Sequence, residues 1–147
     1  MEVKTLKGAI ADTNEVQLYL ERQLNVPSSQ IRNLRDAEAT RAAIIGAFCD
    51  LRNDSRIQNG DPILIYFAGH GGECDVPAGW AAGGSKIQML IPYDFGTEIN
   101  NCNVHGIPDR TVAALLDRLA KEKGDNIVGP ISFTYTAHAD YATDHHI

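Results

Sequence analysis

The segment Pro62–Ala68 (PILIYFA) is the feature that most narrows the folds open to this chain. It is apolar throughout, is rich in β-branched and aromatic residues, and follows the turn-forming triplet Asn59-Gly60-Asp61. An unbroken apolar run of this length is typical of a parallel strand that helices cover on both faces. The segment therefore predicts an α/β protein with a mainly parallel sheet.

Three other segments show the apolar spacing of helices. Residues 1–24 form the first, which ends before Pro27. The second begins after Thr40, whose hydroxyl can accept a free backbone N–H of the first turn. The third begins at Pro108 and ends at Gly124, which suits a left-handed stop. The residues expected on the buried faces are Val16, Tyr19, Leu20, Leu24, Ile44, Ile45, Phe48, Leu51, Val112, Leu115, Leu116 and Leu119.

The remaining segments are read as strands and a loop. Ile31–Leu34 and Ile87–Ile91 are strand candidates, and the glycine-rich stretch Gly69–Gly84 reads as a long loop. Apolar and polar residues alternate from Ile131 to Tyr135, which indicates a half-exposed strand. We expect that strand at an edge of the sheet, because Gly129-Pro130 would interrupt a central strand.

Composition excludes several classes of partner. The chain has 147 residues, enough for one domain, and a formal net charge of −6, which argues against nucleic-acid binding through a basic face. No apolar run approaches the roughly 20 residues that cross a bilayer, so we expect no membrane partner. The three cysteines, Cys49, Cys74 and Cys102, are far apart and odd in number, which favours a reducing, cytoplasmic location.

The sharpest chemical signal is His70, which stands between glycines directly after the apolar strand. Catalytic groups of parallel α/β sheets gather beyond the carboxyl ends of strands. Histidine titrates near neutrality and can exchange protons with a nucleophile or a leaving group. Gly69 and Gly71 allow a sharp turn and leave the Gly71 N–H free to face a developing oxyanion. The alternative is a polar turn that merely ends a strand, since short motifs are weak evidence without context.

Several ordered motifs resemble those of the caspase-like cysteine peptidases, including the metacaspases. The segment Tyr66–Gly72 (YFAGHGG) is similar to the histidine motif of that family. The resemblance spans about residues 6 to 127 and is specific, because its motifs occur in order. The other similar segments are Leu6–Asp12, Ala39–Arg41, Leu90–Asp94, Ile107–Leu119 and Gly124–Ile127.

The resemblance implies a caspase-like three-layer α/β/α sandwich and a Cys–His dyad that hydrolyses a peptide or protein substrate. It implies that His70 transfers protons and that the N–H of Gly71 helps to hold the oxyanion. Some metacaspase-like proteins need calcium, but this chain has no EF-hand spacing, so we expect no cofactor. Cys102 and His105, with His70 and Cys74, could bind zinc, but we expect no metal because such a pair is common by chance.

The chain differs from the family before the first helix and after the third helix. Family members carry the nucleophilic cysteine on the strand after the third helix, but no cysteine follows Cys102. Ser132 and Thr134 lie near the expected place, and a hydroxyl is a poor substitute because it needs a well-aligned base. Met1–Thr5 is too short and polar to replace the apolar strand that precedes the first helix in the family.

We therefore predict the family of the domain and the peptidase activity of this chain separately. Residues 1–127 are expected to form a partial caspase-like peptidase domain, and residues 128–147 a divergent tail from an altered or truncated coding region. We predict a caspase-like cysteine endopeptidase domain that is inactive as this chain, because the nucleophilic segment is missing. The alternatives are a non-catalytic interaction or decoy module that regulates an intact caspase-like relative, and a fragment that folds poorly.

Overall fold

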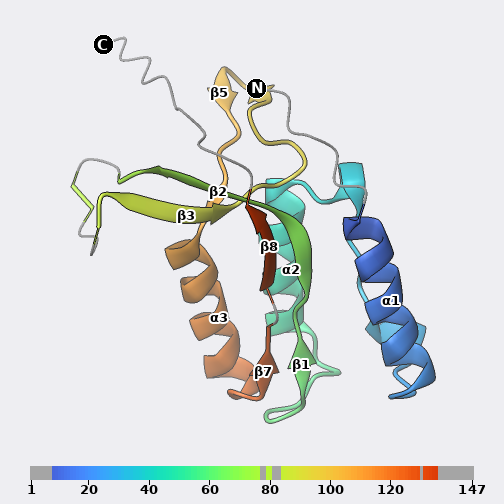
Figure 1. Ribbon diagram of the computed structural model, residues 1–147. Coiled ribbons are helices and arrows are strands. Elements are labelled where there is room, and N and C mark those ends of the chain that lie inside the picture. Colours follow the sequence, from blue (N-terminus) through green and yellow to red (C-terminus); the bar gives the residue numbers. More distant parts are fainter. Residues whose placement is uncertain (1–7, 77–78, 81–83, 130, 136–147) are drawn as a thin grey trace.

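The computed structural model describes residues 8–76, 79–80 and 84–129, together with the backbone of residues 131–135. Figure 1 shows helix α1 (Ala9–Arg22) on one side of the central strands. Helices α2 (Arg41–Asn53) and α3 (Asp109–Lys123) pack together on the other side. Helices therefore lie on both faces of the apolar strand, as its sequence predicted.

The central strands combine parallel and antiparallel pairing. β1 (Ile63–Leu64) and β2 (Phe67–Asp75) pair in parallel with β7 (Ile127–Val128) and β8 (Ile131–Tyr135), respectively. β3 (Lys86–Leu90) pairs antiparallel with the second half of β2, and β6 (Ile107–Pro108) pairs antiparallel with β3. The larger sheet has the order β6-β3-β2-β8 among the described residues, so the predicted parallel ladder is present within a mixed sheet.

Short elements complete the connections. The 3-10 turns η1 (Ser28–Gln30) and η2 (Asp36–Glu38) lie between α1 and α2. The hairpin of β4 (Glu98–Ile99) and β5 (Cys102–Asn103) lies between β3 and β6 in the chain. The strand predicted at Ile131–Tyr135 is confirmed, and it stands at one end of the order of the described sheet.

The helix ends follow the predicted capping chemistry. Thr40 Oγ1 accepts the N–H of Ala43 at 3.2 Å, which confirms Thr40 as the N-cap of α2. Gly124 ends α3 with φ of 86°, and a Cβ there would lie 2.9 Å from the backbone nitrogen of Gly60. The Gly60 N–H also donates to the Lys123 carbonyl at 2.7 Å. The end of α3 and the turn before β1 are therefore fixed against each other.

The core lies between the strands and the pair formed by α2 and α3. Ile107 and Leu119 are completely buried. The predicted faces of both helices are confirmed, because Phe48, Val112 and Leu119 are buried and Ile44, Ile45, Leu51, Leu115 and Leu116 pack against them. By contrast, α1 has no buried residue, and the predicted burial of Tyr19 and Leu24 is wrong. Side chains fill only part of the space between α1 and the strands, so the apolar face of α1 is only partly buried.

Two further predictions need correction. Gly69–Gly84 is not one long loop, since residues 69–75 continue β2. Pairing with β3 outweighs the low strand propensity of glycine, and that pairing is a tertiary effect that propensity does not reveal. Ile31–Leu34 is not a strand in the described structure, because it pairs with no other strand there. Its backbone is nevertheless extended at Ile31, with φ of −105° and ψ of 118°.

Lys123 ties the end of α3 to the loop that follows α2. Its Nζ donates to the carbonyls of Asp54 at 2.7 Å and Ile57 at 2.8 Å. We expect Lys123→Met to lower the free energy of unfolding by about 1–2 kcal/mol, because both half-buried carbonyls lose a charged donor. Urea unfolding followed by circular dichroism measures this loss.

Lys121→Met is the matched control for that substitution. Lys121 Nζ pairs with Asp117 at 2.7 Å on the exposed side of the same helix. Exposed pairs of this spacing contribute little, so we expect a change below about 0.5 kcal/mol. Equal effects of the two substitutions would contradict the role assigned to Lys123.

Candidate active site

His70 lies in the middle of β2, next to β8 on one side and to the start of the β3 pairing on the other. The residue is 8% exposed and borders the large cavity described below. Its carbonyl accepts the N–H of Ile91 at 3.0 Å. His70 is therefore held on the rigid sheet, at the point where the parallel ladder gives way to the antiparallel one.

Close packing explains two of the glycines around His70. A Cβ on Gly69 would lie 2.4 Å from Cζ of Phe67, and a Cβ on Gly72 would lie 2.9 Å from Cδ1 of Ile91. Neither distance is compatible with normal van der Waals contact, so a larger residue at either position would displace its neighbour. The two glycines therefore allow the side chains of Phe67 and Ile91 to pack directly against the backbone of β2.

Gly71 is buried within β2 and stands in register with Leu90 of β3 and Tyr135 of β8. The sharp turn predicted at this glycine is wrong, because the strand continues through it. The predicted contact between its N–H and an oxyanion stays a prediction.

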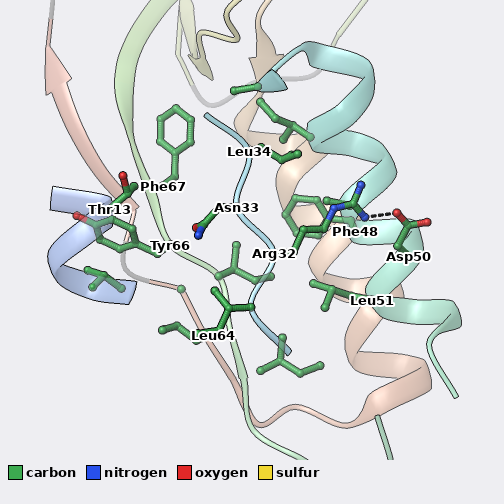
Figure 2. Close-up of a pocket in the computed structure, with 18 of the residues that line it drawn as sticks. Thr13, Arg32, Asn33, Leu34, Phe48, Asp50, Leu51, Leu64, Tyr66 and Phe67 are labelled. Atoms are coloured by element: carbon green, nitrogen blue, oxygen red, sulfur yellow. Dashed lines mark hydrogen bonds and ion pairs between the residues drawn. The ribbon is translucent and has the colours of Figure 1, made fainter. Parts of the chain in front are cut away.

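A cavity of about 1240 Å³ opens beside the first half of β2. Figure 2 shows its walls, which come from α1, the extended segment Ile31–Arg35, α2 and the chain that runs from β1 into β2. Most lining side chains are apolar, and the lining continues along the strand as far as His70. The histidine thus borders an open, largely apolar space.

The strand β8 occupies the neighbouring position where the family's nucleophile would be expected. Parallel pairing sets Thr134 in register with His70 and Ser132 in register with Ala68. In-register residues of adjacent strands have backbones about 5 Å apart. None of residues 131–135 is a cysteine, so β8 offers no thiol beside His70.

None of the three cysteines lies on β8 beside His70. Cys49 lies on α2, and Cys102 lies on β5, which is not part of the sheet that holds His70. Cys74 is on β2, four residues or about 13 Å beyond His70. Burial raises the pKa of the Cys74 thiol, and the neighbouring charge of Asp75 raises that pKa further. A protonated thiol at neutral pH is a weak nucleophile.

Three side chains outside β2 make contacts that hold distant parts of the chain together. Asp94 Oδ1 accepts the backbone N–H of Arg41 at 2.8 Å, so this carboxylate caps the start of α2 from a distant loop. The guanidinium of Arg110 lies 4.6 Å from the ring centre of Trp80, which fixes the loop before β3 on the start of α3. No group of three or more metal-ligating side chains is found in the described chain.

These features define a class of protein: an α/β domain that carries a buried histidine on a strand, beside a cavity and a parallel neighbouring strand. A family model described as Caspase domain matches residues 2–130, and the chain therefore belongs to the caspase domain family of cysteine peptidases. The predicted caspase-like α/β fold is confirmed by this match. The search of curated proteins returns no match.

Among the described residues, no helix has the length and hydrophobicity that spanning a membrane requires.

Proposed function

We propose that this chain is the histidine-bearing part of a caspase-type cysteine endopeptidase and has no peptidase activity by itself. The observation that carries the proposal is the pairing of β8 with β2, which sets Thr134 and not a cysteine beside His70. A caspase-type peptidase forms a thioester with its substrate, and a hydroxyl without a well-aligned base does not replace the thiolate. His70 and Gly71 would then be the remaining members of a catalytic set.

A peptidase assay tests this proposal. Fluorogenic peptides that end in Arg, Lys or Asp cover the common charged preferences, and each is assayed with and without calcium. We expect no turnover by the chain above the uncatalysed rate, and no change on His70→Gln. The control His105→Gln alters an exposed histidine away from β2. Turnover that His70→Gln abolishes and His105→Gln preserves would contradict the proposal.

A second candidate function is that of a non-catalytic module that binds another polypeptide, such as an intact caspase-like relative, in the cytoplasm. The specific observation that favours it is the large apolar cavity beside β2, because sizeable open apolar surfaces often mark interaction sites. Titration of the chain into an active caspase-type peptidase should then change the rate of substrate cleavage. An unchanged rate at a tenfold excess of the chain would argue against regulation of that peptidase.

A further inference from the structure

The turn before β1 contains Asn59, the one asparagine of the sequence that a glycine follows. The Asp61 N–H donates to the Gln58 carbonyl at 3.1 Å, and Gly60 has φ of 91° at the third position, as in a type II turn. Both Asn59 and Gly60 are exposed. Such an asparagine is chemically reactive, because a glycine has no Cβ to shield its own backbone nitrogen.

The reaction open to this pair is deamidation through a cyclic imide. The backbone nitrogen of Gly60 loses its proton and forms a bond to Cγ of Asn59, while Nδ2 takes up a proton and leaves as ammonia. Water then adds to one of the two carbonyl carbons of the imide and breaks the bond of that carbon to the nitrogen. Addition at Cγ gives aspartate. Addition at the backbone carbonyl carbon gives isoaspartate, and water is the only co-reactant.

In the folded chain, the nitrogen that must attack is held in a hydrogen bond. The Gly60 N–H donates to the Lys123 carbonyl at 2.7 Å, and the Gly60 carbonyl accepts Nδ2 of Asn126 at 3.1 Å. An N–H in a hydrogen bond loses its proton less readily, and a fixed peptide unit does not rotate towards Cγ. The reaction therefore waits for an opening that separates the turn from the end of α3.

Lys123 holds the turn closed with its backbone and its side chain. Its carbonyl accepts the Gly60 N–H, and its Nζ donates to the carbonyls of Asp54 and Ile57. All three partners belong to the loop between α2 and β1. Loss of the two side-chain contacts should therefore make the opening of this loop more frequent.

The end of α3 leaves no room for a longer backbone in the turn. A Cβ on Gly124 would lie 2.9 Å from the Gly60 nitrogen and 3.5 Å from Oδ1 of Asn59. Isoaspartate adds a carbon to the main chain between residues 59 and 60, so the turn has to move. The carbonyl of Asn126, whose side chain binds Gly60, accepts the Ile63 N–H at 3.0 Å. Movement of the turn therefore reaches the start of the β1–β7 pairing.

We propose that Asn59-Gly60 is a deamidation site gated by the contact between the turn and the end of α3, and that its isoaspartate product weakens the pairing of β1 with β7. The closed turn restrains the reaction, and each opening exposes the site to it. Loss of ammonia makes the change permanent. The inference goes beyond the proposed function and does not depend on whether the chain has peptidase activity.

The test compares the full chain with a synthetic peptide of residues 55–64 in mildly alkaline buffer. Peptide mapping by mass spectrometry measures the conversion of Asn59 in both. We expect the folded chain to react at least about tenfold more slowly than the peptide, because only its opened fraction reacts. Asn53, which is exposed and precedes an aspartate, is the internal control and should stay unchanged.

Two lysine variants distinguish gating by α3 from the effect of the sequence alone. Lys123→Met should accelerate the conversion about fivefold, the smaller effect of the stability loss predicted above. Lys121→Met should leave the rate unchanged, since Lys121 pairs with Asp117 on the exposed side of the helix. Far-UV circular dichroism verifies that both variants are folded. Asn59→Gln should remove the conversion at this position, because the longer side chain closes its ring far more slowly.

Urea unfolding tests the consequence of the modification. Chromatography separates the isoaspartate form, which we expect to unfold at a lower urea concentration than the unmodified chain. An isoaspartate form of unchanged stability would overturn the proposed effect on the β1–β7 pairing. A peptide that stays intact, a chain that reacts as fast as the peptide, or equal rates in folded Lys123→Met and Lys121→Met would overturn the gated site itself.

Discussion

Thr134→Cys is expected to yield a thiol that reacts with iodoacetamide at pH 7 about tenfold faster than an ordinary cysteine. Position 134 is in register with His70 on the adjacent parallel strand. An imidazole next to a thiol stabilises the thiolate, which lowers the thiol pKa and accelerates alkylation. Peptide mapping by mass spectrometry follows the new site separately from Cys49, Cys74 and Cys102.

Ser132→Cys is the matched control for this reactivity. It adds the same group on the same strand, but in register with Ala68 instead of His70. We expect ordinary reactivity there, and we expect His70→Gln to remove the advantage of Thr134→Cys. Far-UV circular dichroism verifies that each variant keeps its fold. Equal alkylation rates at positions 132 and 134 in folded variants would contradict the assigned site.

Leu119→Ala is expected to lower the free energy of unfolding by about 3 kcal/mol, the largest stability change among our predictions. Leu119 is 0% exposed and lies in the cluster that joins α3 to α2 and the strands. Removal of three carbons from a closed core loses their burial and leaves a cavity. Thermal unfolding should show a fall in Tm of about 10 °C for a domain of this size.

Leu24→Ala provides the corresponding surface control. Leu24 is 55% exposed and follows the end of α1. Substitutions at such sites change stability by about 0.5 kcal/mol or less. If Leu119→Ala were as mild as Leu24→Ala, the described core between α2 and α3 would be wrong.

Local chemistry made much of this fold predictable. Thr40 and Gly124 act on backbone groups within one turn of their own helices, so the sequence around them was sufficient. The apolar spacing of α3 likewise indicated Val112 and Leu119 as buried residues. These predictions needed no knowledge of the rest of the chain.

The errors involve partners that are distant in sequence. Gly69–Asp75 forms a strand because β3 and β8 pair with it, and glycine-rich sequence alone favours a loop. Ile31–Leu34 has the composition of a strand but no partner in the described structure. Tyr19 is 57% exposed and does not line the cavity that Val16 and Leu20 of the same helix border, so the apolar spacing of α1 did not reveal which side chains face the strands.

Of the two strands at the candidate site, the sequence pointed to the residue on β2 but not to the residue opposite it on β8. The apolar strand and the glycines around His70 in the sequence pointed to this histidine, and the structure places it buried on β2 at the border of the cavity. Its position opposite Thr134 depends on the register between strands. The pairs β1–β7 and β2–β8 have the same register, although each strand is interrupted after Leu64 or Val128. No local sequence pattern predicts this register. The capping role of Asp94 was also missed, because the helix that it caps begins at Arg41, far back in the chain.

The pairing that puts Thr134 beside His70 is tested most directly in solution, by cross-strand nuclear Overhauser effects between β2 and β8 on the isotope-labelled chain. We expect contacts between the backbones of His70 and Thr134, and between those of Phe67 and Ile131, which have the same offset in the parallel register. Contacts that join His70 to a different partner strand, or the lack of any parallel pairing with residues 131–135, would contradict it.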